Sequence, residues 1–177
     1  MHQTTPAEDD QLPPLCNLKQ RLCADSIIVA RVATDEHRTS ASDHTNVFIM
    51  MDQYTGFPFA TALTKRTREA HKRILKFFVG PGDSPDIMVK SDAAGEITSA
   101  VAELNWHPEP SLENRWPHNA ALESMIGTFK SVVRASMLQS GFPQDGWDCC
   151  IPHASLSLGT TKKARILPHN VAPQETF

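Results

Sequence analysis

The chain has 177 residues, of which 40% are hydrophobic and 21% are charged, a composition typical of globular proteins that excludes a largely disordered chain. The formal net charge of −3 at pH 7 gives no global attraction to nucleic acid, so a polyanion site would have to be a local patch. No apolar run is long enough to span a bilayer, and the first ten residues lack the basic and apolar regions of a signal peptide. We therefore expect an intracellular protein that does not bind membranes.

The amino-terminal segment differs in composition from the sequence that follows it. Residues 1–20 are rich in proline and polar side chains and are interpreted as a disordered or linker tail, which leaves residues 21–177 as one domain. Within this domain, residues 25–33 carry apolar side chains at both the odd and the even positions, which point to opposite faces of a strand. Such a pattern is typical of a central strand that is covered on both faces.

The sequence after residue 46 alternates short apolar runs with runs of helical periodicity. Apolar side chains recur at helical spacing in the segment before Gly80. They do so again in a longer segment that ends at Gly141 and Pro143. Strands are predicted at residues 47–52, 57–63 and 85–92, and helices around residues 70–78, 96–104 and 119–140. Three strands followed by a helix, a strand and further helices predict a layered α/β fold.

Two carboxylates occupy positions that differ from those of core residues. Asp92 ends a predicted strand, and Glu123 lies in the first turns of the long predicted helix. A strand end and a helix start can meet above a sheet edge, where two hard oxygen ligands would bind Mg²⁺. Alternatively, Asp92 caps the following helix and Glu123 complements its own helix dipole. The residues alone leave both interpretations open.

Cysteine and histidine do not form a recognisable metal motif. Of the four cysteines two are adjacent, Cys149 and Cys150, and the eight histidines are scattered without His-x3-His or HExxH spacing. We therefore predict no zinc site.

Three passages carry more specific information. VFIMMDQYTGFPFATALTKRT joins an aliphatic strand to Asp52, an aromatic-glycine turn and a returning strand, and IMVKSDAAGEI joins a strand to Asp92. WPHNAALESMIGTFKSVVRASMLQSGFPQDGW places Asn119 four residues before Glu123, at the start of a basic amphipathic helix. In this order the passages resemble the integrase catalytic core of retroviruses and, more closely, of copia-like LTR retrotransposons.

The resemblance implies an RNase H-like fold with a mixed central sheet flanked by helices. It also implies that Asp92 and Glu123 are catalytic residues that bind Mg²⁺ or Mn²⁺, in a phosphoryl transfer that joins retroelement ends to target DNA. A homo-oligomer, a nuclear location if the protein is functional, and an origin as a fragment of a transposable element's Pol polyprotein are further implications.

The first acid of the integrase pattern is the main departure. In the copia-like pattern the catalytic acid comes five positions after the Asp of a Gly-Asp pair. If Ala24 and Asp25 are aligned with that pair, Ala30 falls at the catalytic position. Asp25 would then lie about 16 Å from the site and on the opposite face of the strand. We therefore expect Ala30 to mark a lost first acid and the enzyme to be impaired or inactive. Asp25 is a weaker candidate, which a bulge or a shifted register would restore.

Glu123, Lys130 and Arg134 follow one face of the long predicted helix. The two cations would extend from a metal site along a bound DNA backbone, or they are solvated surface, and both interpretations stay open. Asn119 could touch DNA or cap the helix. The lysines and arginines between residues 65 and 76 are interpreted as an exposed face.

Three functional classes remain. The first is a retrotransposon integrase core for DNA integration, degenerate if Ala30 is the lost acid. The alternative is a decayed or domesticated domain that binds nucleic acid or protein without catalysis. The third is a structure-specific nuclease of the same architecture, which the Asn-x-x-x-Glu helix with its basic face disfavours.

Overall fold

A mixed five-stranded sheet forms the centre of the described structure. The computed structural model describes residues 19–29, 39–82, 86–92, 94–110 and 120–161. The strands are β1 (Arg21–Ile28), β2 (Asn46–Asp52), β3 (Pro58–Leu63), β4 (Met88–Ser91) and β5 (His107–Pro110). Their order is β3-β2-β1-β4-β5, with β1 antiparallel to β2 and parallel to β4.

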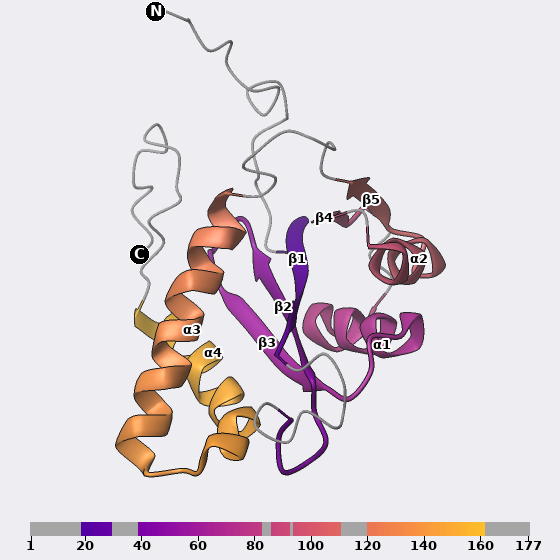
Figure 1. Cartoon of the computed structure of the whole chain (residues 1–177). Helices are drawn as coiled ribbons and strands as arrows, with labels where there is room; N and C mark the ends of the chain where they lie inside the picture. Colours follow the sequence, from indigo (N-terminus) through magenta and orange to yellow (C-terminus); the bar gives the residue numbers. More distant parts are fainter. Residues whose placement is uncertain (1–18, 30–38, 83–85, 93, 111–119, 162–177) are drawn as a thin grey trace, which may run out of the picture.

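Helices cover both faces of this sheet. They are α1 (Arg68–Val79), α2 (Gly95–Glu103), α3 (Ala120–Ser140), the 3₁₀ helix η2 (Gln144–Cys149) and α4 (Cys150–Thr161). α1 and α2 lie on one side of the sheet, and α3 and α4 lie on the other (Figure 1). The predicted α/β fold, with a mixed central sheet flanked by helices, is confirmed.

The position of β1 corrects the prediction for residues 25–33. The strand begins at Arg21, four residues earlier than predicted, and its last residue is Ile28. A charged residue can start this buried strand because the Arg21 guanidinium binds Glu109 of β5, with nitrogen-to-oxygen distances of 2.6 and 3.1 Å. A partner on β5, the strand beyond β4, therefore allows β1 to begin at a charged residue, which hydrophobicity alone does not predict.

Three of the described elements were not predicted, namely β5, η2 and α4. β5 contains Pro108 and Pro110, which argue against a strand in a sequence, but β5 is the edge strand beside β4, where a missing amide donor is tolerated. α4 follows η2 and buries Ile151, Ala154 and Leu158 at helical spacing. The other predicted strands and helices are present, with their ends shifted by a few residues.

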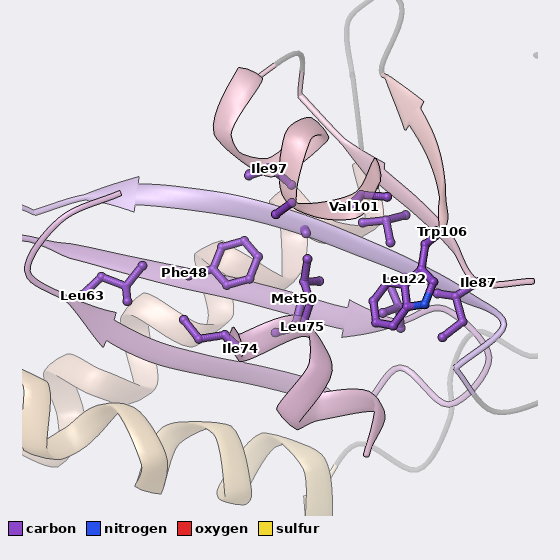
Figure 2. Packing of buried hydrophobic residues seen from close by; sticks show 13 residues of the cluster. Leu22, Phe48, Met50, Leu63, Ile74, Leu75, Ile87, Ile97, Val101 and Trp106 are labelled. Carbon is purple, nitrogen blue, oxygen red and sulfur yellow. The ribbon is translucent and has the colours of Figure 1, made fainter. Parts of the chain in front are cut away.

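The first core layer lies between the sheet and the pair α1 and α2. Figure 2 shows Leu22, Phe48 and Met50 from the sheet beside Leu75 of α1 and Ile97 of α2. All five side chains are fully buried. The burial of this layer fixes α1 against the sheet.

The second core layer lies on the opposite face and involves α3, η2 and α4. Cys23 and Ile49 of the sheet pack there against Met125 and Phe129 of α3. Because successive side chains of a strand point to opposite faces, β1 alternates between the two layers. Asp25 therefore shares the α3 face with Cys23, and Ser26 lies on the α1 face.

A histidine is fully buried in the first layer. The ring of His71 on α1 packs edge-on against Phe48, with 4.6 Å between the ring centroids. Its Nδ1 lies 2.8 Å from the carbonyl oxygen of Thr67, the residue that caps α1. Burial lowers the pKa of His71, with the Thr67 carbonyl and Glu96 opposing this effect and Arg66 adding to it. The imidazole is therefore neutral in the folded protein near pH 7.

We predict that His71 makes the fold less stable in mild acid. Because the folded pKa lies below the unfolded value of about 6.5, the unfolded chain takes up a proton first, so stability is full above that value and falls as pH drops through it. Urea unfolding at pH 7.5 and 5.5 should show a smaller loss of unfolding free energy on acidification in His71→Phe than in the wild type. His107→Gln, a change at an exposed histidine, is the control, and an equal pH dependence in His71→Phe and wild type would contradict the prediction.

Candidate carboxylate site and its basic groove

The pairing of β1 with β4 places two carboxylates at one level of the sheet. Ala24 of β1 is the partner of Ser91, the last residue of β4. Asp25 and Asp92 are the residues that directly follow this pair on two adjacent parallel strands. Asp25 lies on the face covered by α3, so these acids meet at the edge of the sheet that α3 overlies.

α3 brings the third carboxylate. Glu123 lies in the first turn of α3, and its side chain is exposed, as is that of Asp92. Burial raises the pKa of Asp25, and the negative charges of Asp92 and Glu123 raise it further. Asp92 and Glu123 are thus both near enough to Asp25 for their charges to act on it.

Two groups oppose this effect on Asp25. The amide of Ser26 donates to Asp25 Oδ1 at 2.6 Å, and the positive charge of Lys130 on α3 also lowers the pKa. The site is therefore an acidic cluster with a cation at its border. Further positive charge near such a cluster would stabilise its ionised carboxylates.

The donor chemistry of the cluster suits a hard divalent cation. Carboxylate oxygens are the preferred protein ligands of Mg²⁺, which keeps several waters and needs few carboxylates. Within the described residues, no group of three or more His, Cys, Asp or Glu side chains is placed so as to hold one ion together. The acids are therefore of the ligand type that Mg²⁺ prefers and lie in the same region, but their side chains do not surround one ion position.

The register also bears on the alternative first acid. Ala30 lies outside the described residues, as does Asn119. The argument that placed Asp25 about 16 Å from the site assumed that the site lies five positions further along the strand. In the structure Ala24 pairs with Ser91, so Asp25 and Asp92 each follow directly after this pair. The choice between Asp25 and Ala30 stays a prediction.

A hollow of about 430 Å³ lies where the end of β1 faces α3. Its wall includes Ile27 and Val29 after Asp25, and Lys130 and Arg134 of α3. Both cations are exposed. The hollow is thus an apolar groove with a basic rim, and its lining on β1 starts at Ile27, two residues after Asp25.

The far wall of the groove is held by a contact that the sequence did not reveal. Trp147 of η2 lines the groove, and the next residue, Asp148, accepts a hydrogen bond from His44 Nδ1 at 2.8 Å. Although burial alone would raise the pKa of Asp148, hydrogen bonds from His44, Ser40 and Ser42 lower it. These residues are 104 or more positions apart in the chain, which is why no sequence spacing predicts the contact.

The basic run near α1 is separate from this site. Arg68 and Lys72 both bind Glu103 of α2, at 2.9 and 2.8 Å, and Arg66 lies 3.7 Å from Glu96. α1 covers the face of the sheet opposite to α3 (Figure 1). This agrees with the interpretation of the run as an exposed face.

Asp52, another acid in the passages quoted above, serves the β2–β3 turn. Its carboxylate accepts hydrogen bonds from the amide of Lys19 and from the amide and hydroxyl of Thr55, at 2.6 to 2.9 Å. It is fully buried and is the last residue of β2, three positions after Ile49, the partner of Asp25. Its oxygens are occupied by the turn, so we assign it a structural role.

Comparisons with known proteins identify the architecture. The sequence matches no protein-family profile and no curated protein. The crystal structure of the catalytic core domain of BIV integrase, in contrast, superimposes with a TM-score of 0.55, at 12% sequence identity, over 81% of this chain and 86% of that chain. This chain has the fold of a retroviral integrase catalytic core. The expected RNase H-like fold, and the resemblance to integrase cores at the level of the fold, are confirmed.

Among the described helices, none combines the length and the apolar composition needed to cross a membrane.

We predict that the ion-free site reduces stability at neutral pH. The folded state raises the pKa of Asp25, so its contribution to stability is present below the unfolded value of about 3.8 and is lost as pH rises through the folded pKa. Asp25→Asn removes the charge and should raise the melting temperature in EDTA at pH 7 by about 2 °C, a small value because the carboxyl is partly exposed. The matched control is Asp86→Asn, a change at an exposed acid that should leave the melting temperature unchanged. A fall in the melting temperature of Asp25→Asn would contradict the prediction.

Proposed function

We propose that the chain is the catalytic core of an integrase, which cuts and joins DNA by metal-dependent phosphoryl transfer. The proposal is supported by the register of β1 with β4, in which Asp25 and Asp92 directly follow the paired residues Ala24 and Ser91, and by the effect of Glu123 on the pKa of Asp25. We propose these three acids as the metal-binding residues. The likeness to the BIV integrase core supplies the fold in which such a site is expected.

The residues of the site have distinct tasks in this proposal. Asp25 is held by a paired strand and by the Ser26 amide, whereas Asp92 and Glu123 are exposed and free to adjust. Bound Mg²⁺ or Mn²⁺ would activate the nucleophile and stabilise the leaving oxygen. Lys130 reduces the repulsion among the acids and would face the phosphates of the substrate.

We propose further that the first acid is Asp25 and that the site is not degenerate. If Ala30 were the lost acid, the site would lie five residues beyond Asp25 along the strand. The pairing of Ala24 with Ser91, just before Asp92, does not support that position. Retroelement ends and target DNA as substrates, a homo-oligomeric assembly, the copia-like origin within a Pol polyprotein and a nuclear location belong to this proposal and stay predictions.

The proposal predicts activity in a disintegration assay, in which the full chain resolves a branched DNA substrate in Mn²⁺. Asp25→Asn, Asp92→Asn and Glu123→Gln should each lower the rate by about 10³-fold or more, because the members of one catalytic unit act together. Glu103→Gln, on the opposite face of the sheet, is the matched control and should retain activity.

Ala30→Asp separates the two candidates for the first acid. If Asp25 is the first acid, Ala30→Asp should not increase the rate. An inert wild type that gains activity from Ala30→Asp would show instead that Ala30 is the lost position and that the assignment of Asp25 is wrong.

A non-catalytic nucleic-acid-binding domain is the second candidate function. The observation that favours it is that no three acids in the described residues surround one point, while the basic rim of the groove is present regardless of metal. This candidate predicts DNA binding that depends on salt and not on divalent ions.

We predict that Lys130 and Arg134 contribute to DNA binding in both cases. Lys130→Ala and Arg134→Ala should each weaken the binding of a duplex in EDTA and lower the slope of log K against log salt by about 1. Lys72→Ala is the matched control, because Lys72 is bound to Glu103 on the other side of the molecule. Affinity measured by fluorescence anisotropy over a range of salt concentrations tests this, and slopes equal to that of the wild type would exclude a role for the rim.

A further inference from the structure

We propose that His71 is a positioning residue for the carboxylate site, and that it orients Asp25 by binding Ser26 from the opposite face of the sheet. This inference rests on the proposed function, because it concerns the metal affinity of the same acids. His71 itself touches neither a ligand nor the substrate.

The hydrogen bonds of the imidazole determine its tautomer. The carbonyl of Thr67 can only accept, so Nδ1 of His71 carries the proton and donates to it at 2.8 Å. Nε2 is then an acceptor. The hydroxyl of Ser26 lies 3.3 Å from Nε2 and therefore donates to it. A continuous chain of contacts thus runs from the start of α1, through the imidazole, to β1.

Ser26 transmits this contact to Asp25 through the backbone. Its amide donates to Asp25 Oδ1 at 2.6 Å, while its hydroxyl binds His71 on the other face. The Ser26 side chain thus holds the orientation of the β1 backbone at this residue, and the Ser26 amide holds the carboxylate of Asp25.

The strand needs such an anchor at this point. The pairing of β1 with β4 ends at Ala24, so from Asp25 onward β1 is paired with β2 alone. A strand that loses one neighbour loses part of its hydrogen-bonded support. His71 supplies a side-chain contact one residue after this loss.

Packing alone does not require a histidine here. A phenylalanine would also fill the space against Phe48, whereas a buried imidazole costs free energy unless both nitrogens are hydrogen-bonded. Both are bonded, one to the cap of α1 and one to the residue beside Asp25. The polar group is therefore placed where it connects α1 to the site.

The test measures Mn²⁺ binding by electron paramagnetic resonance on the full chain, without DNA, at a temperature well below every variant's melting point. His71→Phe and Ser26→Ala each remove the contact, and their double variant removes both partners. His71→Gln keeps an acceptor for the Ser26 hydroxyl. Leu75→Ala is the matched control, because Leu75 is fully buried in the same helix and contacts the same core layer.

We expect His71→Phe and Ser26→Ala each to weaken Mn²⁺ binding by about tenfold, the lower end of the range for outer partners of metal ligands. The double variant should be no weaker than either single variant, because both act through one contact. His71→Gln should bind within about threefold of the wild type. Leu75→Ala should lower the melting temperature and leave Mn²⁺ affinity unchanged.

Asp25→Asn distinguishes the failure of this inference from the failure of the proposed function. If Asp25→Asn loses Mn²⁺ affinity while His71→Phe and Ser26→Ala keep it, the metal site stands and the positioning role is excluded. The positioning role is also excluded if Leu75→Ala weakens binding as much as His71→Phe does. If Asp25→Asn binds Mn²⁺ like the wild type, or the wild type does not bind it, both the site and the inference are overturned.

Discussion

The parallel pairing of β1 with β4 is the constraint on which the rest of the structure depends. It aligns Ala24 with Ser91, and so sets the following acids, Asp25 and Asp92, side by side. The same strand pairs with β2 from Leu22 to Ile28. Because β1 is central, its side chains alternate between two buried layers. A shift of its register by one residue would move every side chain of β1 to the opposite face of the sheet.

The two faces of the sheet consequently perform different tasks. The α3 face carries the carboxylates and the groove bordered by Lys130 and Arg134. The α1 face carries the anchor at His71, and Arg68 and Lys72 of α1 are paired with Glu103 of α2. Part of the basic run is thus paired with acids of α2, whereas Lys130 and Arg134 of α3 stay exposed on the other side of the sheet.

The carboxylate cluster is electrostatically unfavourable by itself. Burial and mutual repulsion raise the pKa of Asp25, and a hydrogen bond and one lysine reduce that effect only in part. Strain of this kind is typical of functional sites, where a bound cation relieves it. In the proposed function, the apolar walls of the groove would strengthen the interaction of its basic rim with phosphate, because their dielectric constant is low.

The sequence by itself determined the α/β class and most strands and helices, because hydrophobic periodicity and glycine or proline boundaries are local signals. It offered Asp92 and Glu123 as candidate acids only through the resemblance to integrase cores, and these stay predictions. It did not determine β5 or the contact of His44 with Asp148, which depend on an edge position and on residues far apart in the chain. Nor did it determine the register of β1, on which the choice between Asp25 and Ala30 depends. An apolar strand fits many registers by composition, and only its hydrogen-bonded neighbours, β2 and β4, select one.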